Sequence, residues 1–195
     1  NPAQAIAHGV GMVHQHFMLI PNHTVSENII LGTPQAFRLQ KSKVRQQIKE
    51  LGTRYGLVLN PDLRVQDLSV GEQQKVEILK VLFRGAKILI LDEPTAVLTP
   101  QESEALYKIL HQMKKDGHSI LFISHKMKEV IELSDRITVL RHGKVKATRN
   151  RDETSPSELA RLMMGESTIQ TAEIKTKASQ FTSDQSQNIT IVRLK

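Results

Sequence analysis

The sequence predicts an α/β domain with a largely parallel sheet. Two segments, residues 88–91 and 119–123, are apolar at nearly every position, which is typical of strands covered by helices on both faces. Segments with apolar residues at helical spacing lie between and beside them, so strands and helices alternate along the chain. Between about residues 24 and 83 only helices are expected, and this stretch interrupts the alternation.

Most of the expected helices begin at a recognisable signal. Four segments have Ser or Thr followed three residues later by Glu, the spacing of a capping box, in which both side chains bind free backbone N–H groups at a helix start. These segments are Thr24–Glu27, Ser69–Glu72, Thr99–Glu102 and Ser155–Glu158. Residues 41–55 lack this signal, but their apolar residues recur at helical spacing with charges between them. A shorter helix is expected around Val130 and Leu133.

The expected strands follow in chain order. A short strand at Val10–His14 precedes the two apolar runs, which end at Asp92-Glu93 and at Ser124-His125. Residues 136–140 and 145–148 predict a hairpin, because the sequence RHGK between them suits a tight turn.

The end of the chain differs in composition from the rest. Beyond Gly165 the sequence is rich in Ser, Thr, Gln and Lys without periodicity, which predicts a linker over residues 166–188. Residues 189–194 predict one more strand, with nothing left in the chain to pair with it. The first domain would then span residues 1–165, and a second would begin at 189–195. The chain also lacks an initiator methionine, so we expect a piece of a longer polypeptide, truncated at its N-terminus.

Composition excludes some classes of protein. The 195 residues include no cysteine, so disulfides and thiolate metal sites are excluded, and no apolar run approaches the ~20 residues of a membrane-spanning helix. The net charge is +7, from 27 Lys and Arg against 20 Asp and Glu. Two basic clusters, within residues 38–54 and 136–151, lack the interleaved aromatic residues of single-strand nucleic-acid binders. We interpret them as solvated faces, with a polyanionic surface or partner as the alternative.

Polar residues follow both apolar strands, at the carboxyl ends where open α/β sheets bind ligands. Hydrolysis of a phosphoanhydride needs one carboxylate to hold Mg²⁺ and another to orient the attacking water, and the adjacent Asp92 and Glu93 suit these tasks. The imidazole of His125, at the next strand end, can donate to a phosphate oxygen. The alternatives are a strand that simply meets a turn and a histidine with a capping or surface role.

The helix start at LSVGEQQ, residues 68–74, is a candidate anion site. Ser69 and Gly71 lie at a helix N-terminus, where free N–H groups and the helix dipole favour negative charge. The alternative is a simple capping box between Ser69 and Glu72. The two interpretations are compatible, because the same N-terminus can be capped in one state and bind phosphate in another.

In their order, these motifs resemble those of the ATP-binding subunits of ABC transporters. GVGMVHQHFMLI with Gln15 resembles the Q-loop, LSVGEQQ the signature, ILILDEP the Walker B strand, TAVLT the D-loop and ISHK with His125 the H-loop. The sequence is most similar to tandem-domain importers of sugars and nucleosides, over roughly residues 1–165. The resemblance implies a P-loop NTPase-like fold, in which residues 24–83 form an inserted helical subdomain that meets the membrane subunits.

One family motif is missing from this sequence. The phosphate loop, G-x-x-G-x-G-K-[ST], does not occur in the chain and is expected upstream of Asn1. The full-length subunit would be an ABC-type ATPase, whereas this piece alone is expected to be inactive.

The resemblance also implies a role for each motif residue. Gln15 and Asp92 would hold Mg²⁺, Glu93 would orient the water, and His125 would contact the γ-phosphate of ATP. The residues that would face ATP held by the opposing domain are Ser69, Gly71, Glu72 and Thr99. Two positions depart from the family pattern: Thr99 stands where the D-loop usually has aspartate, and Val70 where the signature usually has a second glycine.

The implied protein lies peripherally at the cytoplasmic face of the membrane. Its partners would be transmembrane permease subunits, a second ABC ATPase domain in the same chain or in a dimer, and indirectly a solute-binding protein; no nucleic acid is expected. One alternative is a soluble ABC ATPase that acts on ribosomes or nucleic acid, which the basic clusters permit. Another is a binding module whose ATPase has decayed, and the intact Asp92, Glu93 and His125 argue against it.

Overall fold

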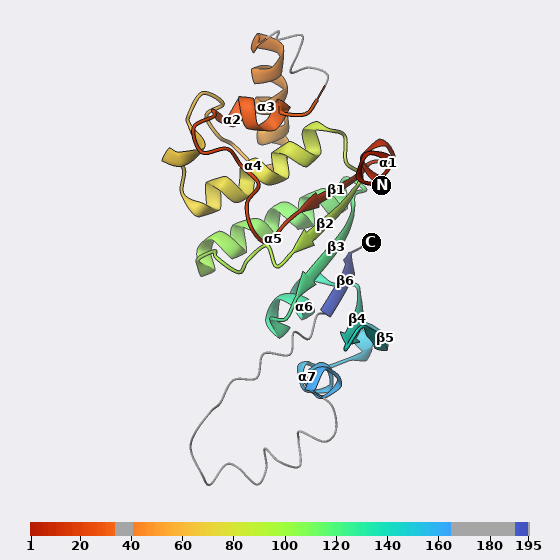
Figure 1. The fold of residues 1–195 in the computed structure, drawn as a ribbon. Coiled ribbons are helices and arrows are strands. Elements are labelled where there is room, and N and C mark those ends of the chain that lie inside the picture. The colour runs from red at the N-terminus through yellow and green to blue at the C-terminus, as the bar shows by residue number, and fades with distance from the viewer. Residues whose placement is uncertain (34–40, 165–189, 195) are drawn as a thin grey trace. The chain divides into compact units, whose positions relative to one another are not determined.

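The computed structural model describes residues 1–33, 41–164 and 190–194 (Figure 1). The chain divides into two compact units, residues 1–121 and residues 122–194. The first unit contains α1 (Pro2–Ala7), β1 (Val10–Val13), α2 (Val25–Ile30), α3 (Lys41–Tyr55), the 3-10 turn η2 (Val65–Asp67), α4 (Val70–Phe83), β2 (Ile88–Asp92) and α5 (Pro100–Lys115). Strand β3 (Ser119–Ser124) begins in the first unit and ends in the second, which contains α6 (Met127–Leu133), β4 (Arg136–Arg141), β5 (Lys144–Asn150), the 3-10 turn η3 (Arg151–Glu153), α7 (Pro156–Met164) and β6 (Thr190–Leu194).

The first unit is built on two parallel strands. β1 and β2 pair in register from Val10 opposite Ile88 to Val13 opposite Leu91. Helix α4 packs against β1, and Gly11 permits this close approach, because a Cβ at residue 11 would lie only 2.8 Å from the Cβ of Val81. The predicted parallel pairing is therefore confirmed for β1 and β2.

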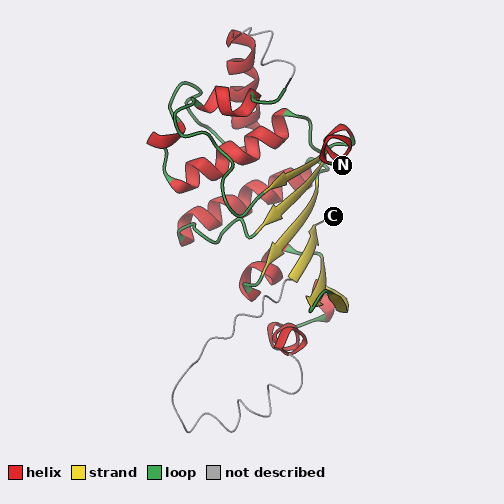
Figure 2. Cartoon of the chain, viewed as in Figure 1, coloured by secondary structure: helices red, strands yellow, loops and turns green. Residues whose placement is uncertain are grey.

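Between residues 24 and 83 the described part of the chain forms helices and no named strand, as predicted (Figure 2). α2 packs on α4, and α3 contacts both. Val25 and Ile29 of α2 and Val44 and Ile48 of α3 are buried between them. The apolar spacing that predicted α3 thus corresponds to its buried face.

The prediction that the strand at residues 88–91 is covered on both faces is wrong for one of them. Leu89 and Leu91 are fully buried, but Ile88 is 42% exposed and Ile90 is half-buried. The face that carries Ile90 borders a cavity of about 480 Å³, which Val10 and Met12 of β1 also line. One face of β2 is therefore packed, whereas the opposite face, which carries Ile88 and Ile90, is only partly covered.

The second unit contains the predicted hairpin. β4 pairs antiparallel with β5 across His142 and Gly143, which both have positive φ angles, 52° and 69°, as the tightest hairpin turns require. Helix α7 packs on α6 and β4 and buries Leu159.

Strand β6 is present where residues 189–194 predicted it, but the prediction that it has no partner is wrong. It pairs antiparallel with β4, with Arg136 opposite Arg193 and Val139 opposite Thr190. The hairpin uses one edge of β4 and leaves the other to accept a strand. The expected linker at 166–188 lies outside the described residues, and the domain boundaries at 165 and 189 stay predictions.

Candidate nucleotide site

Two of the predicted site segments leave the sheet at the same edge. Val13 ends β1 opposite Leu91 of β2, and the strands are parallel. Gln15 follows Val13 by two residues, and Asp92 follows Leu91 directly, so both lie at the carboxyl ends of neighbouring strands. Gln15 is exposed, and Asp92 is half-buried. The structure therefore brings an amide and a carboxylate to one edge of the sheet.

Glu93 adopts an unusual backbone conformation at this edge. Its φ angle is 43°, in the left-handed region that residues with side chains seldom adopt. Its carbonyl accepts a hydrogen bond from the N–H of Ala96 at 3.0 Å, and Leu98 N–H donates to the carbonyl of Thr95 at 3.3 Å. These turns hold the half-buried Glu93 in a conformation that costs free energy, and such conformations concentrate at functional sites.

The predicted signature segment forms the start of α4. Ser69 Oγ accepts from the N–H of Glu72 at 3.3 Å, and Glu72 Oε2 accepts from the N–H of Ser69 at 2.9 Å, which is a complete capping box. The capping interpretation of Ser69 and Glu72 is thus confirmed for this state. The N-terminus of α4 is stabilised by side chains of its own helix.

The predicted D-loop segment ends in a second complete capping box. Thr99 N–H and Thr99 Oγ1 both donate to Glu102 Oε2, each at 2.9 Å. The Thr99 N–H and hydroxyl hold the pKa of Glu102 below its usual value. Glu102 also lines, with Ser69, Gly71 and Glu72, a cavity of about 230 Å³ between α4 and α5. Three of the four residues predicted to face ATP therefore lie together, and Thr99 adjoins them through Glu102.

His125 belongs to the second unit, where it follows β3. The turn around it is fixed by neighbours: Ser124 Oγ donates to Glu129 Oε2 at 3.0 Å, and Lys126 N–H donates to Ser124 Oγ at 3.0 Å. Lys126 and Glu129 also form an ion pair at 3.3 Å. The approach of His125 to Asp92 and Glu93 stays a prediction.

Asn28 of α2 lies outside the predicted set of residues, yet it organises the segment after Gln15. Its side chain is 1% exposed, and its Oδ1 accepts from the N–H of Ile20 at 2.8 Å. Its Nδ2 donates to the carbonyls of Ile20 and Thr24, both at 3.1 Å, and of His23 at 3.4 Å. The signal that could find it is an amide between the apolar positions of a short amphipathic helix.

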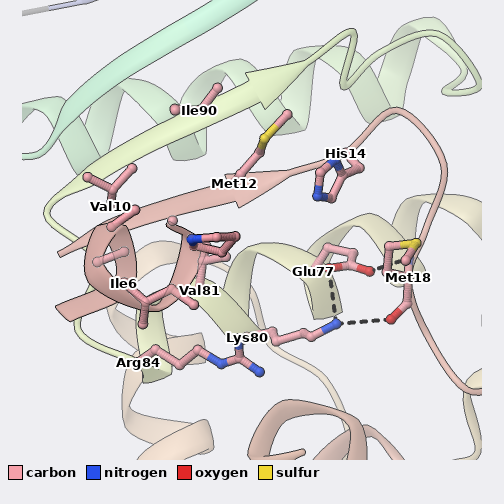
Figure 3. Close-up of a pocket in the computed structure, with 14 residues that line it drawn as sticks. Ile6, Val10, Met12, His14, Met18, Glu77, Lys80, Val81, Arg84 and Ile90 are labelled. Carbon is pink, nitrogen blue, oxygen red and sulfur yellow. Dashed lines mark hydrogen bonds and ion pairs between the residues drawn. The ribbon is translucent and has the colours of Figure 1, made fainter. Parts of the chain in front are cut away.

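Glu77 and Lys80 of α4 are likewise outside the predicted set (Figure 3). Both bind the backbone of Met18, three residues beyond Gln15. The signal in the sequence is a carboxylate inside the apolar run VEIL, where a helix face would otherwise be uniformly apolar.

The donor set at the strand edge fits a magnesium nucleotide. Among the described residues no group of three or more His, Asp and Glu side chains is arranged to hold a metal ion. Mg²⁺ bound with a nucleotide needs less, because it keeps several waters and takes one or two protein oxygens besides the phosphates. Gln15 and Asp92 can supply such oxygens.

In the part of the chain that the structure describes, no helix combines the length and apolar character needed to span a membrane.

A parallel α/β core with a helical insertion, and with Gln15 and Asp92-Glu93 at its strand ends, agrees with the P-loop NTPase fold that the sequence motifs imply. Residues 1–96 match the family model described as ABC transporter. The chain belongs to the ABC transporter family. Two solved structures share the fold: cbiO1 from Clostridium perfringens, part of the ABC transporter complex cbiONQ, with a TM-score of 0.64, 25% identity and coverage of 88% of this chain and 64% of that one; and the ATP-binding cassette MJ0796 in a dimeric post-hydrolysis state bound to ADP and Pi, with a TM-score of 0.61, 27% identity and coverage of 73% and 62%.

Among curated proteins, the chain is 50% identical over 169 residues to the nucleoside import ATP-binding protein NupA of Lactococcus lactis, covering 86% of this chain and 33% of that protein. It is 50% identical over 167 residues to the guanosine import ATP-binding protein NupO of Bacillus subtilis, covering 85% and 33%. It is 38% identical over 168 residues to the ribose import ATP-binding protein RbsA of Bacillus subtilis, covering 85% and 34%. The chain thus spans about a third of the length of these relatives.

Proposed function

We propose that this chain is part of the ATP-binding and ATP-hydrolysing subunit of an ABC importer, which couples hydrolysis to uptake of a small solute of the sugar or nucleoside type. The observation that carries the proposal is the parallel register of β1 and β2, because it delivers Gln15 and the Asp92-Glu93 pair to one sheet edge. The relatives support the solute class, since their names include import of nucleosides, guanosine and ribose.

In this proposal the residues of the strand edge divide the work of hydrolysis. Mg²⁺ bound with ATP supplies positive charge against the phosphates. The Gln15 amide oxygen and the Asp92 carboxylate hold the ion or its waters. Glu93 orients the attacking water and accepts its proton at a carboxylate oxygen. His125 donates a hydrogen bond to the γ-phosphate.

The start of α4 serves an ATP held by the opposing domain. Ser69, Gly71, Glu72 and Thr99 are the residues proposed to face it. Two capping boxes occupy this region now, and the helix dipole of the 14-residue α4 favours an anion at the same end. ATP binding would exchange a side-chain cap for a phosphate oxygen.

The proposed partners are transmembrane permease subunits, which meet the helices between residues 24 and 83, and a second ABC ATPase domain in the same chain or in a dimer. A solute-binding protein acts indirectly through the permease. The proposed location is the cytoplasmic face of the membrane. Several residues of the basic clusters pair with carboxylates, such as Arg45 with Asp62 at 2.5 Å and Arg149 with Glu158 at 3.3 Å, which supports solvated faces over a nucleic-acid surface.

The test is ATP hydrolysis by the full-length protein reconstituted with its permease subunits in proteoliposomes. We expect hydrolysis that depends on Mg²⁺, that rises with solute-loaded binding protein, and that accompanies solute uptake. The protein should be recovered with membranes. Salt-sensitive recovery with RNA instead, without stimulation by any permease, would overturn the importer in favour of a soluble ATPase.

A further inference from the structure

Helix α4 binds the chain segment that follows Gln15 through the backbone N–H and the backbone carbonyl of Met18. The Met18 N–H donates to Glu77 Oε1 at 2.7 Å, and the Met18 carbonyl accepts from Lys80 Nζ at 3.0 Å. Lys80 Nζ also lies 3.6 Å from Glu77 Oε2, so the two side chains form an ion pair one helical turn apart (Figure 3). Glu77 and Lys80 therefore act on Met18 as a single clamp.

The clamp binds the backbone of the segment and not its side chain. Met18 is 66% exposed, so packing contributes little to its position. On the sheet side the segment borders the cavity of about 480 Å³, lined there by His14 and Met12, rather than a packed layer. The hydrogen bonds to Glu77 and Lys80 are consequently the contacts that fix Met18 to α4.

Burying Glu77 and Lys80 on the packed face of α4 costs free energy. Side chains of Glu77 and Lys80 are only 6% and 14% exposed, and removing charges from water costs several kcal/mol unless pairing and hydrogen bonds compensate. The neighbouring Val76, Ile78 and Leu79 are buried apolar residues, so α4 can pack without charged groups. We therefore interpret the Glu77–Lys80 ion pair as a device that positions the Met18 backbone rather than one that stabilises α4.

Helix α4 carries two motifs of the proposed function at once. Its first turn holds Ser69 and Gly71, and its third and fourth turns hold the segment three residues beyond Gln15. A helix is a rigid element, so a displacement at one end reaches the other. Gln15 is three residues from Met18, so at most ~10 Å of chain separates Gln15 from the residue that α4 holds.

We propose that Glu77 and Lys80 are positioning residues that tie the Gln15 loop to the signature helix. A movement of α4, when Ser69 and Gly71 engage ATP of the opposing domain, would then shift Gln15 at the other nucleotide. This inference rests on the proposed function. Neither residue touches the nucleotide; both act through the Met18 backbone.

The contact itself is tested by hydrogen exchange at the Met18 amide in the full-length protein assembled with its permease subunits. Glu77→Ala should raise the exchange rate of this amide at least tenfold, and Lys80→Met should raise it less. Glu77→Gln keeps an acceptor oxygen and the side-chain volume, and it should retain part of the protection if Glu77→Ala does not fold. The matched control is Lys108→Met, at an exposed lysine of α5, which should leave the rate unchanged. Exchange in Glu77→Ala within twofold of the parent would overturn the clamp.

The coupling is tested by a double-mutant cycle between Lys80→Met and Gln15→Ala, read as single-turnover ATP hydrolysis. Lys80→Met should lower the rate fivefold or more in the parent and less than twofold in the Gln15→Ala background, because no amide remains to be positioned. Lys80→Arg should restore most of the rate. Equal losses in both backgrounds would overturn the coupling. Failure of the proposed function would appear differently, as a parent protein that hydrolyses no ATP, and the exchange measurement does not depend on hydrolysis.

Discussion

The Glu102 carboxylate links the starts of α5 and α4 through Gly71. Glu102 caps its own helix, where its Oε2 accepts from the Thr99 N–H at 2.9 Å, and its carboxylate also lies beside Gly71. Its Oε1 occupies the space that a Cβ at residue 71 would need. The turn that follows Glu93 and the signature segment therefore share one carboxylate, and only glycine fits at residue 71 without displacing it.

This relationship predicts the effect of Gly71→Ala. Alanine in a helix is ordinarily more stable than glycine by roughly 0.5–1 kcal/mol. Here we expect the opposite, a loss of about 1 kcal/mol in the free energy of unfolding, because Glu102 must leave Gly71 and loosen its cap at Thr99. Urea unfolding of the 195-residue chain measures it. In a Glu102→Ala background the same substitution should become neutral or stabilising, and stabilisation in the parent would contradict the crowding.

Asn28→Ala is expected to be among the costly substitutions outside the apolar core. It removes one acceptor and three donor contacts from a buried position and leaves the Ile20 N–H without its partner. A loss of about 2–3 kcal/mol should follow, visible as a lower urea midpoint of the chain. The matched control is Asn22→Ala, at an exposed asparagine of the preceding turn, which should stay within about 0.5 kcal/mol of the parent.

The local features of the fold could be predicted from the sequence because their causes are local. The capping boxes at Thr24, Ser69 and Thr99 need only residues three apart, and each is formed. The His142-Gly143 turn needs two residues that tolerate positive φ, and it is formed as well. The parallel direction of β1 and β2 also follows from the sequence, through the alternation of strands and helices along the chain.

Contacts between distant residues have no such signature. Glu77 lies 59 residues from Met18, and the carboxylate of Glu102 lies beside Gly71 of another helix. The exposure of Ile88 and the pairing of β6 with β4 depend on what covers each face or edge. The spacing of apolar residues in a sequence predicts a strand and its apolar face. It does not predict which distant residue or strand packs against that face or edge.

Arg54 and Asp116 predict a dependence of stability on pH. The guanidinium of Arg54 binds Asp116 at 2.7 Å and holds the pKa of that carboxyl below its ordinary value of 3.8. A carboxyl whose pKa is lower in the folded state stabilises it above the unfolded pKa and loses this effect as pH falls through the folded pKa. The urea midpoint of the parent should exceed that of Asp116→Asn at pH 5, and the difference should shrink below pH 3.8. A difference that is constant over this range would contradict the ion pair.

Glu93→Gln, in the full-length protein assembled with its permease subunits, tests the assignment of the base. Glutamine keeps the size of the side chain and leaves Asp92 in place, but it removes the group that orients the attacking water and takes its proton. ATP should still bind, and hydrolysis at this site should fall by about 10²-fold or more, the scale for loss of a general base. The measurement is single-turnover hydrolysis with the second ATP site already disabled.

Asp92→Asn provides the contrast for Glu93→Gln, because the two carboxylates are assigned different tasks one residue apart. Loss of a metal-holding oxygen should weaken Mg²⁺-dependent ATP binding itself, so Asp92→Asn should raise the Kd for MgATP, whereas Glu93→Gln should leave it nearly unchanged. The left-handed backbone at Glu93 is set by the turn to Ala96, and glutamine keeps it, so a slow variant reports on the carboxylate rather than on the turn. If Glu93→Gln hydrolyses ATP within about threefold of the parent, a change of only ~0.65 kcal/mol in the barrier, Glu93 is not the base and this site regulates rather than hydrolyses.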